Sequence, residues 1–302
     1  MIKNNTIYFI KHWQLYIMLV LPLAFFIVFK YFPIYGVQIA FKDFNVFKGV
    51  AESGWVGLSV FKDIFTQQGF YIALRNTFLL NGLDLLFGFP APIILAVLLN
   101  EIKFIRFKKI AQTLLYLPHF ISWVIIGGIV YQVFSTNFGM INLFLDQFGI
   151  GPIPFLSEKN SWLVTYTSVG IWQSIGWGSI IYLAAITGIN KELYEAAEVD
   201  GAGRLRKIWN ITLPGIRSTI IVLLILRIGD MIDIGFDRPF IIGNVMVREY
   251  SDVLSTYIYR VGLQSGQYEN ATAVGLFQAV VGLVFILSAN YISKKTTDEG
   301  II

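Results

Sequence analysis

Six long apolar segments constrain what this chain can fold into. Each has about 20 residues or more, the length that a helix needs to cross the roughly 30 Å hydrocarbon core of a bilayer. The segments are too long for single strands and lack strict alternation, so helices are favoured over a β-barrel. We therefore predict an all-α integral membrane protein with six transmembrane helices, at residues 13–32, 72–99, 110–134, 162–189, 216–236 and 272–293.

The composition excludes several other classes of protein. Only 14% of the residues are charged, and the mean hydropathy is +0.66. A soluble domain carries about 25% charged residues, so a disordered chain is excluded and a soluble enzyme is disfavoured. The chain has no cysteine, which excludes disulfides and thiolate nucleophiles, and its two histidines (His12 and His119) are far apart in sequence. We predict no catalytic residue, no metal site and no cofactor bound by this chain.

The distribution of basic residues predicts the orientation of the chain. Thirteen of the 23 Lys and Arg residues lie near the N-terminus, in the second and fourth connections and in the C-terminal tail. Loops rich in Lys and Arg stay in the cytoplasm, so both termini are predicted to be cytoplasmic. The excess of Lys and Arg is therefore explained by the topology and gives no reason to expect a nucleic-acid partner. We expect a cytoplasmic arm at 1–12, a transmembrane domain at 13–293 and a cytoplasmic tail at 294–302, with a cleaved signal peptide as the alternative for the first segment.

The connection between the fourth and fifth segments, residues 190–215, carries the most informative pattern. Its first half favours a short helix that Gly201 and Gly203 can end. Thr212 is placed to cap the following span. Pro214 would then lie in the first turn of that span, where a missing N–H costs little.

This pattern resembles the EAA motif of binding-protein-dependent ABC importers, which has E-A-A, a glycine four positions later and then I-x-L-P. Residues 86–92, 116–123 and 175–186 are in addition similar to sugar-importer permeases of the LplB type, within the larger family that contains the maltose permease subunits. The resemblance therefore covers nearly the whole chain and implies a type I ABC importer permease fold. The motif residues, with Asp200 beside them, are Glu195, Ala196, Ala197, Asp200, Gly201, Ile211, Leu213 and Pro214.

The resemblance also implies partners. It implies a heterodimer with a second, homologous permease subunit, two ATPase subunits that bind ATP and Mg, and an extracellular solute-binding protein that delivers an oligosaccharide. In such importers the EAA helix docks in a cleft of the ATPase, and its first glutamate, here Glu195, meets a basic ATPase residue. The chain itself has no G-x-x-x-x-G-K-[ST] sequence, so it lacks a phosphate-binding loop of its own. The expected location is the cell (cytoplasmic) membrane, as a multi-pass protein in contact with lipid.

Charged and aromatic residues inside the spans suggest a substrate path. Ionisable groups in a bilayer usually face a partner or a water-filled cavity. Spacings of three and four predict one shared helix face for Leu223, Arg227, Asp230, Met231 and Ile234. On this face Arg227 and Asp230 can neutralise each other. The resemblance places sugar contacts on the spans that flank the EAA loop. The expected path residues are Ser174, Trp177, Arg227, Asp230, Met231 and Asp84.

Other interpretations of the same residues stay open at this level. Arg227 and Asp230 could form a purely structural ion pair, and Gly176, Gly178 and Ser179 are interpreted as packing residues. His119 is expected to make a core hydrogen bond, with a proton relay as the alternative. Two further functions are a secondary transporter driven by an ion gradient through intramembrane aspartates, and a membrane enzyme that uses a carboxylate pair.

Overall fold

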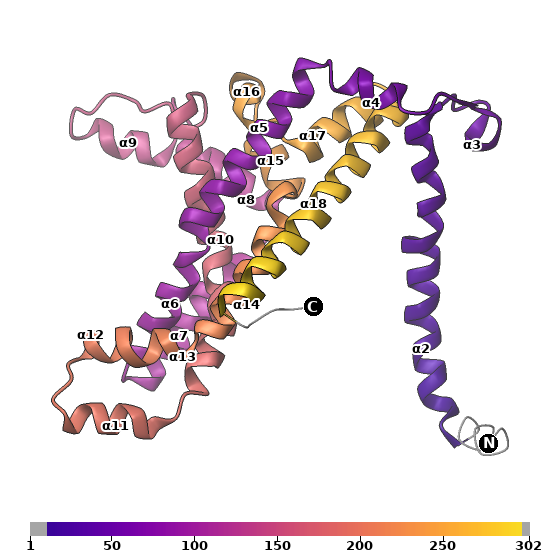
Figure 1. Cartoon of the computed structure of the whole chain (residues 1–302). Helices are drawn as coiled ribbons and strands as arrows, with labels where there is room; N and C mark the ends of the chain where they lie inside the picture. Colours follow the sequence, from indigo (N-terminus) through magenta and orange to yellow (C-terminus); the bar gives the residue numbers. More distant parts are fainter. Residues whose placement is uncertain (1–10, 298–302) are drawn as a thin grey trace. The chain divides into compact units, whose positions relative to one another are not determined.

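The computed structural model describes residues 11–297, which form a helical protein with two compact units (Figure 1). Unit 1 contains residues 11–66 and 260–276, and unit 2 contains residues 67–259 and 277–297. The predicted all-α class is confirmed. Most of the predicted arm (1–12) and part of the predicted tail (294–302) lie outside the described residues.

Unit 1 is built on one long apolar helix. α2 (Trp13–Phe26) continues through the π-helical η1 (Ile27–Tyr31) into the 3₁₀ helix η2 (Phe32–Phe41). The apolar helix therefore runs nine residues beyond the predicted end at Phe32. Pro33 lies in the first turn of η2, where its missing N–H costs little, so it does not stop the helix. The unit also contains the antiparallel pair β1 (Lys42–Asp43) and β2 (Gly54–Trp55), with α3 (Gly49–Glu52) and α4 (Ser59–Ile64).

Unit 2 is organised around the long helix α10 (Lys159–Thr187). Preceding it in sequence, α5 (Gln68–Leu83), the π-helical η3 (Asp84–Gly88) and α6 (Pro90–Glu101) form a second long helical segment. α6 packs along α10, and Pro90 opens α6 at a position that needs no N–H donor. The unit also contains α9 (Met140–Asp146), α11 (Lys191–Val199), α12 (Arg204–Lys207), η5 (Ile208–Thr212), α15 (Asp237–Ile242), η7 (Val245–Val247), α16 (Arg248–Ser251) and α17 (Leu254–Ile258), besides the two bent spans described below.

The third predicted span is not one straight helix. α7 (Ile105–Tyr116) ends in the 3₁₀ turn η4 (Leu117–Phe120), and α8 (Trp123–Phe134) follows at an angle of 104°. Pro118 removes a backbone donor, which tightens the helix into a 3₁₀ turn. The chain is then extended at Ile121, and the Ser122 side chain accepts a hydrogen bond from the backbone N–H of Ile125 to cap α8.

The fifth predicted span also differs from a continuous helix at 216–236. α13 (Leu213–Gly215) is followed, after a bend of 61°, by α14 (Arg217–Gly229) and the 3₁₀ turn η6 (Asp230–Ile232). The helix therefore stops at Gly229, and Ile234 lies beyond it. The predicted helix face that joins Leu223 to Met231 and Ile234 is interrupted for this reason.

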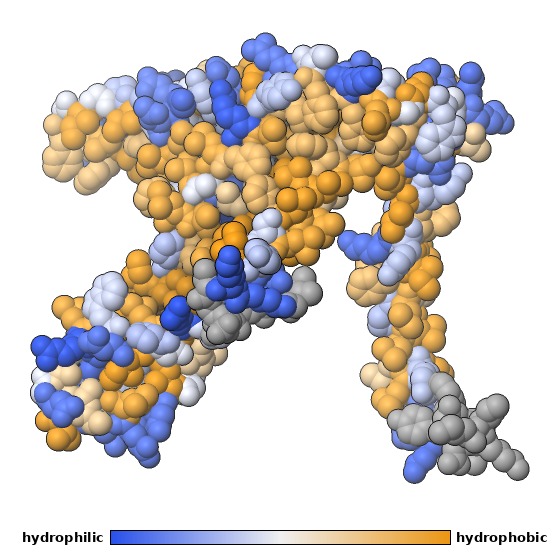
Figure 2. Space-filling model, in the orientation of Figure 1, coloured by the Kyte–Doolittle hydropathy of each residue, from blue (hydrophilic) through white to orange (hydrophobic). Residues whose placement is uncertain are grey.

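Four helices in the described residues are long and apolar enough to span a membrane, and up to six if each bent pair counts as one span. The last of them is α18 (Tyr268–Thr297), which follows η8 (Tyr259–Gln264), begins in unit 1 and continues in unit 2. Figure 2 shows apolar side chains over the middle of unit 2, with polar side chains gathered around α11 and α12 at one end. Such a surface fits a hydrocarbon environment better than water.

Two buried clusters stabilise unit 2. The larger joins α5, α8 and α10 to the segment after α14 and includes Leu80, Ile126, Trp162, Tyr166 and Val247. The smaller joins α6, α10 and the start of α14. A cavity lies among the same elements.

Candidate functional site

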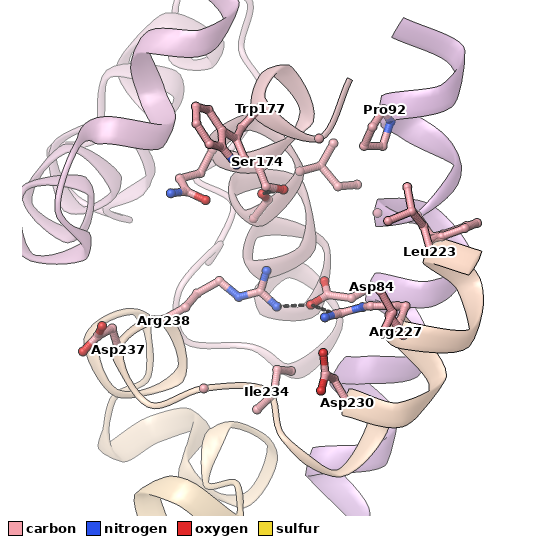
Figure 3. Close-up of a pocket in the computed structure, with 18 of the residues that line it drawn as sticks. Asp84, Pro92, Ser174, Trp177, Leu223, Arg227, Asp230, Ile234, Asp237 and Arg238 are labelled. Atoms are coloured by element: carbon pink, nitrogen blue, oxygen red, sulfur yellow. Dashed lines mark hydrogen bonds and ion pairs between the residues drawn. The ribbon is translucent and has the colours of Figure 1, made fainter. Parts of the chain in front are cut away.

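A cavity of about 560 Å³ opens between α10, η3, the end of α14 and the segment from η6 to α15. Figure 3 shows Ser174 and Trp177 of α10 at one end of this cavity and Asp230 and Ile234 at the other. Five of the six predicted path residues line it: Asp84, Ser174, Trp177, Arg227 and Asp230. The sixth, Met231, is not among its lining residues. Met231 lies in η6, where the helical spacing that grouped it with the others no longer holds.

Asp84 carries the charge that organises the wall of the cavity. Its Oδ2 lies 3.3 Å from Nη2 of Arg227 and pairs with Nη2 of Arg238 (Figure 3). The predicted pair between Arg227 and Asp230 is therefore wrong, because the guanidinium of Arg227 turns to the second predicted span. Asp230 is exposed, and its carboxylate makes no ion pair within residues 11–297.

Arg238 is as deeply buried as Asp84, with 11% of each side chain exposed, whereas 33% of the Arg227 side chain is exposed. Its guanidinium lies 4.0 Å from the ring centre of Tyr166 and 6.0 Å from that of Trp123, within the range of cation–π attraction. Gly170 of α10 provides space for this guanidinium, because a Cβ at that position would collide with it. Arg238 lies just beyond the predicted fifth span (216–236), and no pattern in the sequence connects it with Asp84.

The small residues of α10 serve packing, as predicted. A Cβ at Gly176 would overlap the backbone of Leu115, and one at Gly178 would come within 3.0 Å of Pro92. Ser179 is fully buried and donates a hydrogen bond to the carbonyl of Gly176. The close approach that these residues permit brings α6 and α7 against α10, and Pro92 of α6 lines the cavity.

The connection after α10 forms the helix that the sequence predicts. α11 is capped by Asn190, whose Oδ1 accepts a hydrogen bond of 3.0 Å from the backbone N–H of Glu192. Gly201 ends the helical turn with a φ of +75°, a conformation that glycine adopts at little cost. Glu195, Ala196 and Asp200 are exposed, and Ala197 is half-buried.

The role expected of Thr212 is wrong in one respect. Its backbone is helical and its hydroxyl makes no capping bond. Instead the buried hydroxyl of Thr212 lies 3.0 Å from the hydroxyl of Tyr194, and this contact ties α11 to the start of the next span. Pro214 was expected in the first turn of the fifth span; it lies in the first turn of α13, and a bend of 61° separates it from α14.

A second cavity, of about 810 Å³, lies between α11, α12 and the end of α6. Glu195 and Glu198 line it, with Lys207 opposite. The ammonium of Lys207 lies 2.9 Å from Oε2 of Glu198, and this hydrogen bond and charge hold the pKa of Glu198 below its ordinary value. Large apolar side chains, which no motif in the sequence had singled out, are exposed on this connection: Leu193, Val199, Leu205 and Trp209.

Comparison with known proteins places these features in context. Residues 74–298 match the protein family described as binding-protein-dependent transport system inner membrane component. The chain is 47% identical to Protein LplB of Bacillus subtilis, over 95% of this chain and 90% of that protein. It is 45% identical to the polygalacturonan/rhamnogalacturonan transport system permease protein YteP of the same organism, over 99% and 93%.

Two solved structures have the same fold. One is a bacterial ABC transporter involved in the import of the acidic polysaccharide alginate. With a TM-score of 0.88 and 42% identity, the similarity covers 97% of this chain and 99% of the solved chain. The other is a bacterial alginate ABC transporter in complex with an alginate pentasaccharide-bound periplasmic protein, also with a TM-score of 0.88.

Proposed function

Because the chain belongs to the binding-protein-dependent transport system inner membrane component family, as a multi-pass membrane protein, we propose that it is the permease subunit of an ATP-driven importer of oligosaccharides. The match covers 74–298, which includes the cavity and the 190–215 connection. The names of YteP and of the alginate transporter support a polysaccharide fragment as the substrate. The observation that carries the proposal is the cavity, where aromatic and charged side chains line one path between long apolar helices.

The cavity has the chemistry that a hydroxyl-rich ligand needs. Trp177 offers an apolar ring face, while Ser174, Arg227 and Asp230 offer polar groups around it. Apolar and aromatic walls with a few polar groups are typical of small-molecule sites. We assign the passage of the sugar to this cavity, with Asp84 holding Arg227 in place.

The proposal includes the partners that the family implies. This subunit pairs with a second, homologous permease and receives its substrate from an extracellular solute-binding protein. Two ATPase subunits bind ATP and Mg and carry out hydrolysis, so this chain is not itself an enzyme. We further propose that the helices form six spans in the cell membrane, with both termini and the EAA loop in the cytoplasm.

α11 is the proposed contact with an ATPase subunit. The exposed Glu195 and Ala196 provide the contact of the EAA motif, and Gly201 allows the sharp turn behind them. The exposed apolar side chains of Leu193 and Val199 supply surface that a partner would bury. The bond between Tyr194 and Thr212 then transmits a movement of α11 to the span that carries Arg227.

The test is uptake and ATP hydrolysis by the complex reconstituted in lipid vesicles, with and without sugar-loaded binding protein. We expect the loaded protein to stimulate hydrolysis in the native complex. Glu195→Ala is expected to lower uptake per ATP hydrolysed. Glu192→Ala is the matched control, because Glu192 lies on the same helix but does not line the second cavity.

Two outcomes would contradict the proposal. If uptake follows a proton or sodium gradient and no ATPase co-purifies, the chain is a secondary transporter. If Glu192→Ala impairs coupling as much as Glu195→Ala does, the effect belongs to the helix as a whole, and the assigned role of Glu195 is wrong.

A further inference from the structure

The 3₁₀ turn η4 is held tightly against α10 beside the cavity. Gly176 lets the backbone of Leu115 approach α10 more closely than any side chain would allow. Three residues earlier on the same helix, Nε2 of Gln173 donates a hydrogen bond of 3.4 Å to the backbone carbonyl of His119. The end of α7 and the turn η4 are therefore both fixed to α10, just before the bend that separates them from α8.

This docking places the imidazole of His119 flat against the indole of Trp177. Their ring centres are 4.7 Å apart and the ring planes differ by 5°. Such a parallel contact is attractive when the rings are offset, and it restricts the rotation of both side chains. Trp177 lines the cavity, and Figure 3 shows its indole near Ser174.

The other face of the indole is left free by these neighbours. Phe120 lies 5.7 Å from His119 and 5.6 Å from Trp177, nearly perpendicular to both rings. A ring at equal distance from two stacked rings lies beside the stack and not on top of it. Trp177 is 47% exposed and lines the cavity, so its uncovered face is available there.

His119 has no other evident task. Its Nδ1 is buried and has no hydrogen-bond partner among residues 11–297, so the hydrogen bond that the sequence suggested is not made by this atom. A proton relay needs a partner at hydrogen-bond distance from each nitrogen. The imidazole is instead placed so that its flat face meets the indole.

We propose that the free face of Trp177 is a stacking site for one sugar ring and that His119 is the positioning residue that holds the indole in place. The inference rests on the proposed function and deepens it. Ser174 and Asp230 line the same cavity and present polar groups to the hydroxyls of a sugar held there. Fixing the indole in advance removes the entropy cost of ordering it when the sugar binds, which corresponds to about a two- to tenfold gain in affinity.

The test uses the reconstituted complex with its binding protein, with trigalacturonate and cellotriose as an acidic and a neutral probe. Uptake per ATP hydrolysed is measured for His119→Phe, His119→Asn, His119→Ala and Trp177→Ala. We expect His119→Phe to stay within about twofold of the native value, because it keeps a flat ring. The other three variants should lose about two- to tenfold or more.

Trp172→Ala is the matched control. Trp172 lies on the same helix with a similar exposure of 43%, but it does not line the cavity, so this variant should transport as the native complex does. Gel filtration of each complex shows whether it assembles. His119→Phe keeps a flat ring without the imidazole nitrogens, whereas His119→Asn keeps a polar amide without the ring, so these two variants serve as the decisive pair.

Each remaining outcome overturns the inference in a recognisable way. If His119→Asn transports normally and His119→Phe does not, His119 acts through a hydrogen bond and not through stacking. If Trp177→Ala transports normally, the indole is not a sugar site, although the proposed function stands. A native complex that takes up neither probe would overturn the proposed function, and this inference with it.

Discussion

Replacing Asp84 by asparagine tests whether the buried charge cluster stabilises the protein. The substitution keeps the size and shape of the side chain but removes the negative charge that Arg227 and Arg238 share. Arg238 suffers most, because only 11% of its side chain is exposed and water cannot replace the lost partner. Leaving one buried charge without its partner typically costs about 3–5 kcal/mol.

The expected loss is large enough to measure by thermal unfolding. A change of 1 kcal/mol shifts the Tm of a domain of this size by roughly 2–4 °C, so 3 kcal/mol predicts a decrease of about 6–12 °C. The assay is the unfolding of the purified native and Asp84→Asn proteins in one detergent at one heating rate. A fixed rate is needed because membrane proteins that unfold irreversibly report a rate-dependent Tm.

Two further variants make this test specific. Asp84→Asn combined with Arg238→Gln removes both buried charges and should regain at least half of the lost Tm, because the uncompensated cation is gone. Asp230→Asn is the matched control: the same chemical change at an exposed carboxylate of the same cavity should cost under about 0.5 kcal/mol. If Asp84→Asn unfolds within about 2 °C of the native protein, or if the double variant is less stable than the single one, the charge cluster does not stabilise the fold as reasoned here.

Two other predictions concern packing and pH. Gly176→Ala places a methyl group against the backbone of Leu115 and should cost about 1–3 kcal/mol in the same unfolding assay, whereas Gly82→Ala, which meets no atom within 4 Å, should be neutral or stabilising by up to about 1 kcal/mol. A destabilising effect of equal size at both positions would contradict the close approach of α7 to α10. The pKa of Glu198 is lowered by its hydrogen bond with Lys207 and by the charge of that lysine. The contribution of this pair to stability is therefore present above the ordinary pKa of glutamate and is lost as the pH falls through the lowered value. An NMR titration of labelled glutamate should show this lowered pKa. Lys207→Met should return it toward the ordinary value, and an unchanged pKa in that variant would refute the assignment.

Much of the secondary structure could be predicted from the sequence because its causes are local. A run of about 20 apolar residues is enough to specify a membrane helix, whatever the rest of the chain does. Asn190 begins α11 by capping it with its side chain. Gly201 ends the helical turn in the left-handed conformation that the pattern suggests. Two helices nevertheless end earlier than the apolar segments predict, one at the turn Leu117–Phe120 and the other at Gly229. Hydropathy measures only how apolar a segment is, so it does not show where a helix tightens into a 3₁₀ turn.

The candidate site depended on tertiary structure to a greater degree. Sequence patterns identified Asp84, Trp177 and Arg227 as polar or aromatic residues in apolar segments, and all three line the cavity. They did not identify Arg238 or the stacking of His119, because a single ring or charge in a short segment has no periodicity to distinguish it. Met231 was expected in the cavity from helical spacing, and the end of α14 at Gly229 removes the basis of that expectation.

The sequence by itself determined which segments are apolar, where α11 starts and turns, and which family the chain resembles. Only the tertiary structure decided which charges meet. Arg227 and Asp230 are neighbours along the chain, yet Arg227 pairs with Asp84, which is 143 residues away. The physical reason is that the strength of an ion pair depends on distance and burial, and both depend on how the helices pack. Two side chains three residues apart share a face only while one regular helix continues. α14 ends at Gly229, between Arg227 and Asp230.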